Sequence, residues 1–200
     1  MDASELDHKY ACAEVIQSWG FHRDQGKWPE LLATFVPDGQ ISISWFSGDF
    51  PEFVDRCRQG FEAGQRSKHQ IFPSLVRVAG ARALAETNIV ILVRQKIAGT
   101  LADLTSYARF LDRLEQGNGR WRIVERTAIY ERDRLDPVGP SENFDRLFTA
   151  SDLSVYPEAY RYMAARLAAA GRTLAPVVYR DGSPHTTQLY LRYQAWLDGK

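Results

Sequence analysis

Runs of apolar residues broken by glycine-containing turns predict a series of long β-strands between residues 69 and 133. The turns contain Gly80, Gly99 and Gly117. Parallel neighbours need crossover connections of about a dozen residues, so strands joined by such short turns should form an antiparallel meander. The expected strands are rich in β-branched and aromatic residues and cover residues 69–78, 83–93, 104–114 and 121–133.

The chain before this meander is expected to be mostly helical. Residues 4–24 show a helical pattern that opens with Ser4 as an N-cap. Shorter helices are expected at residues 27–35 and 51–64, on either side of a strand at residues 40–46 that follows a turn at Pro37-Asp38-Gly39. One face of the first helix is expected to meet the core and to end in a carboxylate; it contains Leu6, Tyr10, Ala13, Gly20 and Asp24.

Helices gathered on one side of an antiparallel sheet form an α+β layer architecture. Residues 24–39, the pair Lys68-His69 and residues 119–126 resemble, in this order, SnoaL-like members of the nuclear transport factor 2-like (NTF2-like) superfamily, relatives of scytalone dehydratase, dehydrochlorinases and polyketide cyclases. The resemblance covers about residues 4–133. It implies an NTF2-like cone, in which a curved antiparallel sheet wraps around the N-terminal helices and leaves a pocket at its open end.

The sequence is expected to divide into a SnoaL-like domain at residues 1–134 and a helical C-terminal extension at residues 135–200. The extension starts with a proline-containing linker and carries predicted helices at residues 157–170 and 186–197. Its apolar and aromatic content is too high for a disordered tail. Two placements are open: the extension covers its own pocket, or it packs on a neighbouring subunit.

Charge and composition exclude several classes of partner. The 200 residues include 25 Lys and Arg and 25 Asp and Glu, so no bulk charge attracts nucleic acid. The acidic start does not resemble a secretory signal, and no run is apolar and long enough to span a membrane, which predicts a cytoplasmic protein. Cys12 and Cys57 have no metal-ligand spacing and are expected to be buried thiols.

His69 is the leading candidate for catalysis, because imidazole takes and returns a proton near neutral pH. The resemblance implies that it pairs with Asp24, as dehydratase-like and dehydrochlorinase-like relatives pair a strand-start His with an Asp from the end of the first helix. A carboxylate on one ring nitrogen fixes the tautomer and stabilises the imidazolium. The competing interpretation is a solvated helix end at Asp24 and a backbone-bonded histidine.

Other candidates would bind the substrate. Arg126 could hold a carboxylate or a departing anion, or could be a surface or subunit-interface charge. Trp19 stands about where some elimination-catalysing relatives have Lys, which argues against dehydrochlorination. Aromatic residues on strands are often plain core, but Trp45, Phe72 and Tyr107 would form a hydrophobic pocket wall if they face inward.

Two functions remain open. The first is a cofactor-independent proton-transfer enzyme, a dehydratase, lyase or isomerase, acting on a hydrophobic, ring-containing small molecule. The second is a non-catalytic ligand-binding module or one resembling a dioxygenase β subunit. The sequence has no phosphate loop, metal-ligand cluster or nucleophile elbow, so no cofactor and no metal are expected. A homo-oligomer, dimer or trimer, is expected under either function.

Overall fold

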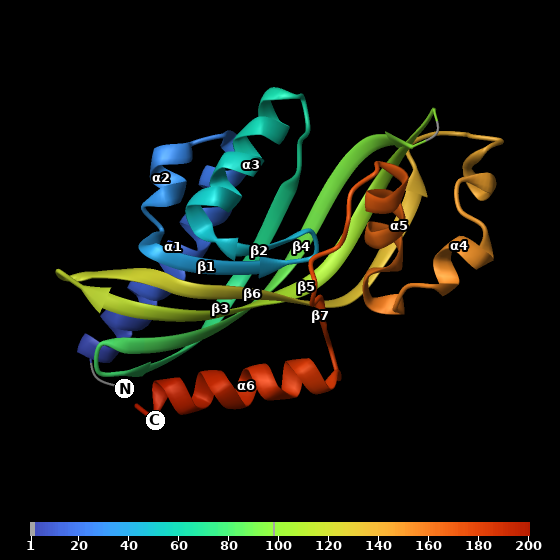
Figure 1. Ribbon diagram of the computed structural model, residues 1–200. Coiled ribbons are helices and arrows are strands. Elements are labelled where there is room, and N and C mark those ends of the chain that lie inside the picture. The colour runs from blue at the N-terminus through green and yellow to red at the C-terminus, as the bar shows by residue number, and fades with distance from the viewer. Residues whose placement is uncertain (1–2, 98) are drawn as a thin grey trace.

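A long, curved sheet forms the centre of the molecule in the computed structural model, which describes residues 3–97 and 99–200 (Figure 1). The strands lie in the order β2-β1-β6-β5-β4-β3, and β7 pairs with β6. The predicted antiparallel meander is confirmed. Its strands are longer than the sequence pattern suggested: β3 (Lys68–Ala79), β4 (Arg82–Ile97), β5 (Thr100–Gly117) and β6 (Arg120–Pro137).

The expectation of a wholly antiparallel sheet is wrong, because β1 and the short β7 both pair in parallel with β6. The hairpin of β1 (Phe35–Ile43) and β2 (Phe46–Asp49) joins the meander through β1, which pairs in parallel with β6. The long connection from β1 to β6, through α3 and four strands, allows this parallel pairing. The predicted turn at Pro37-Asp38-Gly39 lies inside β1, where the register with β6 shifts between Phe35 and Gln40.

The helices α1 (Ala3–Gln25), α2 (Trp28–Leu32) and α3 (Phe50–Glu62) cover the concave face of the sheet (Figure 1). The predicted core face of α1 is wrong in its first half, where Leu6 and Tyr10 are 58% and 69% exposed. The buried side is set by Cys12 and Ile16. Tyr10 stands two residues before Cys12, about 200° around the helix, and therefore on the opposite side.

The C-terminal extension contacts both faces of the sheet. The predicted helix at residues 157–170 is formed by η2 (Glu158–Tyr160) and α5 (Arg161–Ala169), and the last predicted helix is α6 (Pro184–Leu197). Helix α6 lies on the convex face (Figure 1), where Leu189, Tyr193 and Leu197 pack with Leu84, Leu111 and Ile129. Between β6 and η2 the chain forms η1 (Phe144–Arg146) and α4 (Ala150–Ser154), and β7 (Tyr179–Arg180) precedes α6.

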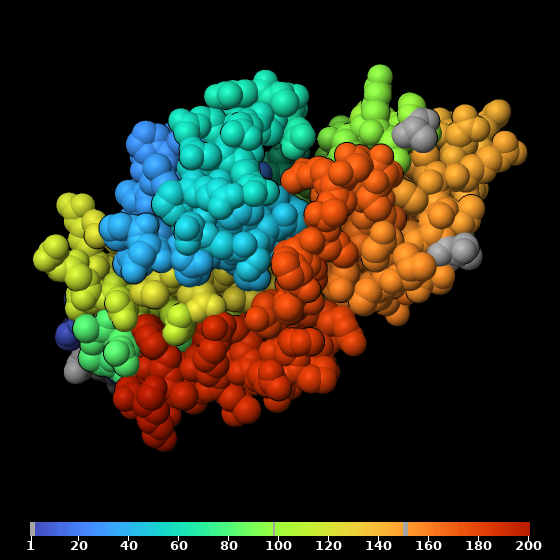
Figure 2. Space-filling model, viewed as in Figure 1, coloured from blue at the N-terminus to red at the C-terminus, as the bar shows by residue number. Residues whose placement is uncertain are grey.

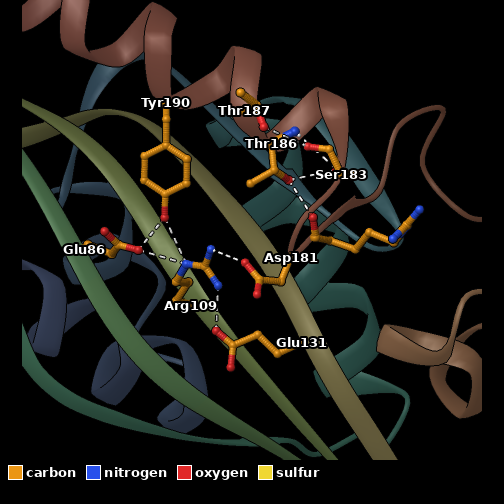
Figure 3. Close-up of polar contacts among 9 residues, drawn as sticks. Glu86, Arg109, Glu131, Asp181, Ser183, Thr186, Thr187 and Tyr190 are labelled. Carbon is orange, nitrogen blue, oxygen red and sulfur yellow. Dashed lines mark hydrogen bonds and ion pairs between the residues drawn. The ribbon is translucent and has the colours of Figure 1, made fainter.

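A charged network fastens α6 and β7 to the convex face. Arg109 of β5 lies among Glu86, Glu131 and Asp181, and Tyr190 of α6 contacts both Arg109 and Glu86 (Figure 3). Surface ion pairs are weak singly, but this arginine is shared by three carboxylates from separate elements.

Among the helices in the described part of the chain, none is long and apolar enough to cross a bilayer.

Candidate active site

A cavity of about 560 Å³ opens between α1, α3, α5 and the concave face of the sheet. The surface is hollowed where the cyan α3 faces the orange α5 (Figure 2). A volume of this size suits a small organic ligand. The apolar part of the wall includes Trp19, Trp45, Phe53, Phe61, Ile91, Val93 and Phe110.

His69 and Asp24 meet at the wall of this cavity. Oδ1 of Asp24 lies 2.6 Å from Nδ1 of His69, and Oδ2 accepts the backbone N–H of His69 at 2.7 Å. Because an ionised carboxylate can only accept, Nδ1 carries the ring proton and Nε2 keeps its lone pair. His69 lines the cavity, and its Nε2 has no hydrogen-bond partner among the described residues.

The close approach of α1 to β3 brings these two side chains together. A Cβ on Gly20 would meet Cδ1 of Ile71 at 2.5 Å, so the glycine lets the helix cross the strand without displacing the Ile71 side chain. Asp24 stands about one turn further along α1, on the same side. The Asp24 carboxylate therefore reaches the first residues of β3, and its side chain is only 3% exposed.

The surroundings of His69 favour the neutral imidazole. Burial lowers the pKa of His69 below its ordinary value of about 6.5, and this effect outweighs the opposing stabilisation by Asp24. The positive charges of Arg23 and Arg126 lower the pKa further. The ring of Trp19 packs edge-on against the imidazole, with centroids 5.3 Å apart. The His69 imidazole is therefore neutral at neutral pH.

Neither placement predicted for Arg126 is found. Its side chain does not line the cavity, and it does not lie at the surface. Its side chain is fully buried, and Nε and Nη2 donate to the two oxygens of Asp112 at 2.7 and 2.8 Å. The guanidinium lies 4.6 Å from the Trp19 ring centroid and 4.0 Å from that of Phe110, both of which line the cavity. Arg126 thus supports the cavity wall from behind.

Two predicted aromatic wall residues lie elsewhere. The pairing of β3 with β4 shifts register between Ile71 and Ser74, and Phe72 at this irregularity is 46% exposed. It lines a second hollow, which shares His69 with the cavity. Tyr107 lies away from the cavity, where its ring meets the guanidinium of Arg132 at 4.5 Å. Alternation along β5 explains this, because Phe110 takes the concave face and Tyr107 the other.

The remaining predicted residues, Trp19 and Trp45, do line the cavity. Trp45 stands at the turn between β1 and β2 and stacks on Phe53, with centroids 5.5 Å apart. The indole Nε1 of Trp19 is buried and has no hydrogen-bond partner among the described residues. Both indoles lie in the wall against which a ligand ring would pack.

The wall also contains residues that sequence reasoning missed. Tyr130 of β6 accepts the backbone N–H of Ser44 at 3.0 Å, and Met163 and Arg166 come from α5. Helix α5 lies outside the region of family resemblance, so no motif pointed to its side chains. Across residues 3–97 and 99–200, no group of three or more His, Cys, Asp or Glu side chains is arranged to hold a metal ion.

Comparison with known families agrees with this fold. The model of the SnoaL-like domain matches residues 4–127. The chain belongs to the SnoaL-like domain family. Pea pathogenicity protein 2 of Fusarium vanettenii is 28% identical over 157 residues, which are 76% of this chain and 65% of that protein. The chain therefore spans slightly less than two thirds of this relative.

Solved structures with a similar fold include relatives named as enzymes. A protein of Novosphingobium aromaticivorans, provisionally assigned as a scytalone dehydratase, superposes with a TM-score of 0.58 at 18% identity, covering 71% of this chain and 100% of that one. A hexachlorocyclohexane dehydrochlorinase gives a TM-score of 0.57 at 12% identity, covering 70% and 95%. Such low identities establish the fold alone.

Proposed function

We propose that this protein is a cofactor-independent proton-transfer enzyme, a dehydratase, lyase or isomerase, that acts on a hydrophobic, ring-containing small molecule. The contact of 2.6 Å between Asp24 and His69 at the wall of the cavity carries the proposal. The family relationship and two structural neighbours named as a scytalone dehydratase, provisionally, and a dehydrochlorinase support an elimination or a related proton transfer.

In the proposed reaction, Nε2 of His69 takes a proton from a carbon next to a carbonyl group or a leaving group. The electron pair of the broken C–H bond moves into the substrate, as an enolate or as a new double bond that expels the leaving group. Asp24 holds Nδ1–H and stabilises the imidazolium that results. His69 then returns the proton to carbon in an isomerase or to the leaving group in a dehydratase.

Exchange of substrate protons with solvent tests this function. A panel of bicyclic ring ketones and their β-hydroxy derivatives would be incubated with the protein in deuterium oxide and followed by NMR. Quenching of tryptophan fluorescence reports binding independently, because Trp19 and Trp45 line the cavity. We expect deuterium incorporation or elimination in the ligands that bind. Tight binding without any exchange or elimination would instead indicate a non-catalytic binding module.

The rate of this exchange should depend on pH through His69. Only the neutral imidazole accepts a proton, and burial lowers its pKa below about 6.5. The rate should therefore fall as pH decreases through a value below 6.5 and be level around neutrality. A pH profile of kcat/KM measures this limb. A half-maximal rate clearly above pH 6.5 would show that another group titrates.

A further inference from the structure

The lining of the cavity is positively charged, although the chain as a whole has no net charge. Lys and Arg equal Asp and Glu at 25 each over the sequence. Among the described residues that line the cavity, however, no Asp or Glu occurs. A cleft lined by charges of one sign raises the local concentration of ligands of the opposite sign. The arginines in this lining are Arg23, Arg56, Arg66, Arg94, Arg166 and Arg172.

Among the described arginines that line the cavity, Arg166 of α5 is the one with a buried nitrogen that lacks a hydrogen-bond partner. Its Nη1 donates to Oε1 of Gln95 at 2.8 Å, while its Nε is buried without a hydrogen-bond partner. Across the described part of the chain, no carboxylate forms an ion pair with it. Burial lowers the pKa of Arg166 to about 10, with a contribution from Arg172, so the guanidinium is still charged at neutral pH. A buried cation without a counter-ion is unfavourable in the empty protein.

Two of the other cavity arginines have carboxylate partners. Arg94 is paired with Asp103, and Arg56 is paired with Glu52, both at the surface. Arg172 follows α5 at the mouth of the cavity and lies 5.0 Å from the ring centroid of Trp45, where it repels Arg166. The α5 side of the cavity is therefore cationic, and His69 and the aromatic residues lie on its other walls.

We propose that Arg166, assisted by Arg172, binds the carboxylate of an anionic substrate whose ring lies on the aromatic wall. This proposal rests on the proposed function, because it takes the cavity to be the site of the reaction. A carboxylate would supply the acceptor that Nε of Arg166 lacks, and charge-assisted hydrogen bonds to guanidinium are among the strongest available. A neutral ligand of the same shape would leave the buried cation unpaired. The cavity thus selects for organic anions.

Naphthoate and naphthamide test this selection, because they share one shape and differ in charge. Binding to the full chain would be followed by tryptophan fluorescence and calorimetry. We expect wild-type protein to bind naphthoate at least about tenfold more tightly than naphthamide, which is the scale of a charge-assisted hydrogen bond. Arg166→Met should lose this preference. Arg134→Met removes an arginine that is 63% exposed and paired with Asp136 outside the cavity, and should keep it.

Equal affinities of the wild type for the two probes, or a preference that survives in Arg166→Met, would overturn the proposal. If Arg166→Met does not fold, Arg166→Gln, which can still donate to Gln95, gives the same comparison. Binding needs no turnover, so His69→Ala should retain the preference for naphthoate even where exchange is lost. A wrong assignment of Arg166 is therefore distinguishable from a wrong proposal of catalysis.

Discussion

Replacing Asp24 by Asn should lower turnover about as far as replacing His69 by Ala, on the order of a hundredfold or more. The two oxygens of Asp24 accept from the backbone N–H and from Nδ1–H of His69. An Asn side chain has one oxygen, and the backbone N–H always needs an acceptor. The NH₂ group of the Asn side chain would then face Nδ1. Because this group can only donate, Nδ1 would have to accept, and the ring proton would move to Nε2. The cavity would be left with a donor where the base is needed.

Steady-state rates on any substrate found by the exchange screen measure this effect. Asp7→Asn makes the same chemical change at an exposed position of α1 and should leave the rate unchanged. The double variant Asp24→Asn/His69→Ala should be no slower than either single one, because the two residues act as a unit. Turnover by Asp24→Asn within a few-fold of the wild type would show that the carboxylate has no part in setting the tautomer.

The pairing of Asp24 with His69 could be anticipated from the sequence because each residue is positioned locally. Asp24 ends a helix and His69 begins a strand, and both positions follow from short-range patterns and family resemblance. Arg166 could not be anticipated in this way. Its place in the wall depends on how α5 packs across the sheet, and the predicted helix at residues 157–170 contained no information on which element it would meet.

The strands could be predicted, but not which way all their side chains face. A shift in the pairing of β5 with β6 falls between Arg113 and Leu114. Because of this bulge at Val124, Ile123 joins the same core as Ala128, whereas strict alternation would place them on opposite faces. Arg126 lies on the concave face, and its partner Asp112 lies directly opposite it on β5. The sequence alone does not reveal this register.

The buried pair of Arg126 and Asp112 supports the proposed base through one intervening ring. Trp19 contacts the Arg126 guanidinium and the His69 imidazole, so the position of the indole depends on the ion pair behind it. The charge of Arg126 also contributes to the lowered pKa of His69. Since both side chains of the pair are 0% exposed, neither can be hydrated if its partner is removed.

Asp112→Ala should therefore lower the free energy of unfolding by about 3–5 kcal/mol, because it leaves the buried Arg126 without a counter-ion. This is a large share of the roughly 5–15 kcal/mol that stabilises a typical protein. Urea unfolding followed by circular dichroism measures the loss. Asp103→Ala breaks a pair of the same bidentate geometry at the surface and should have a far smaller effect. The double variant Asp112→Leu/Arg126→Met removes both charges and should recover most of the stability. If it is as unstable as Asp112→Ala, the loss comes from packing around Trp19 and Phe110 and not from the unpaired charge.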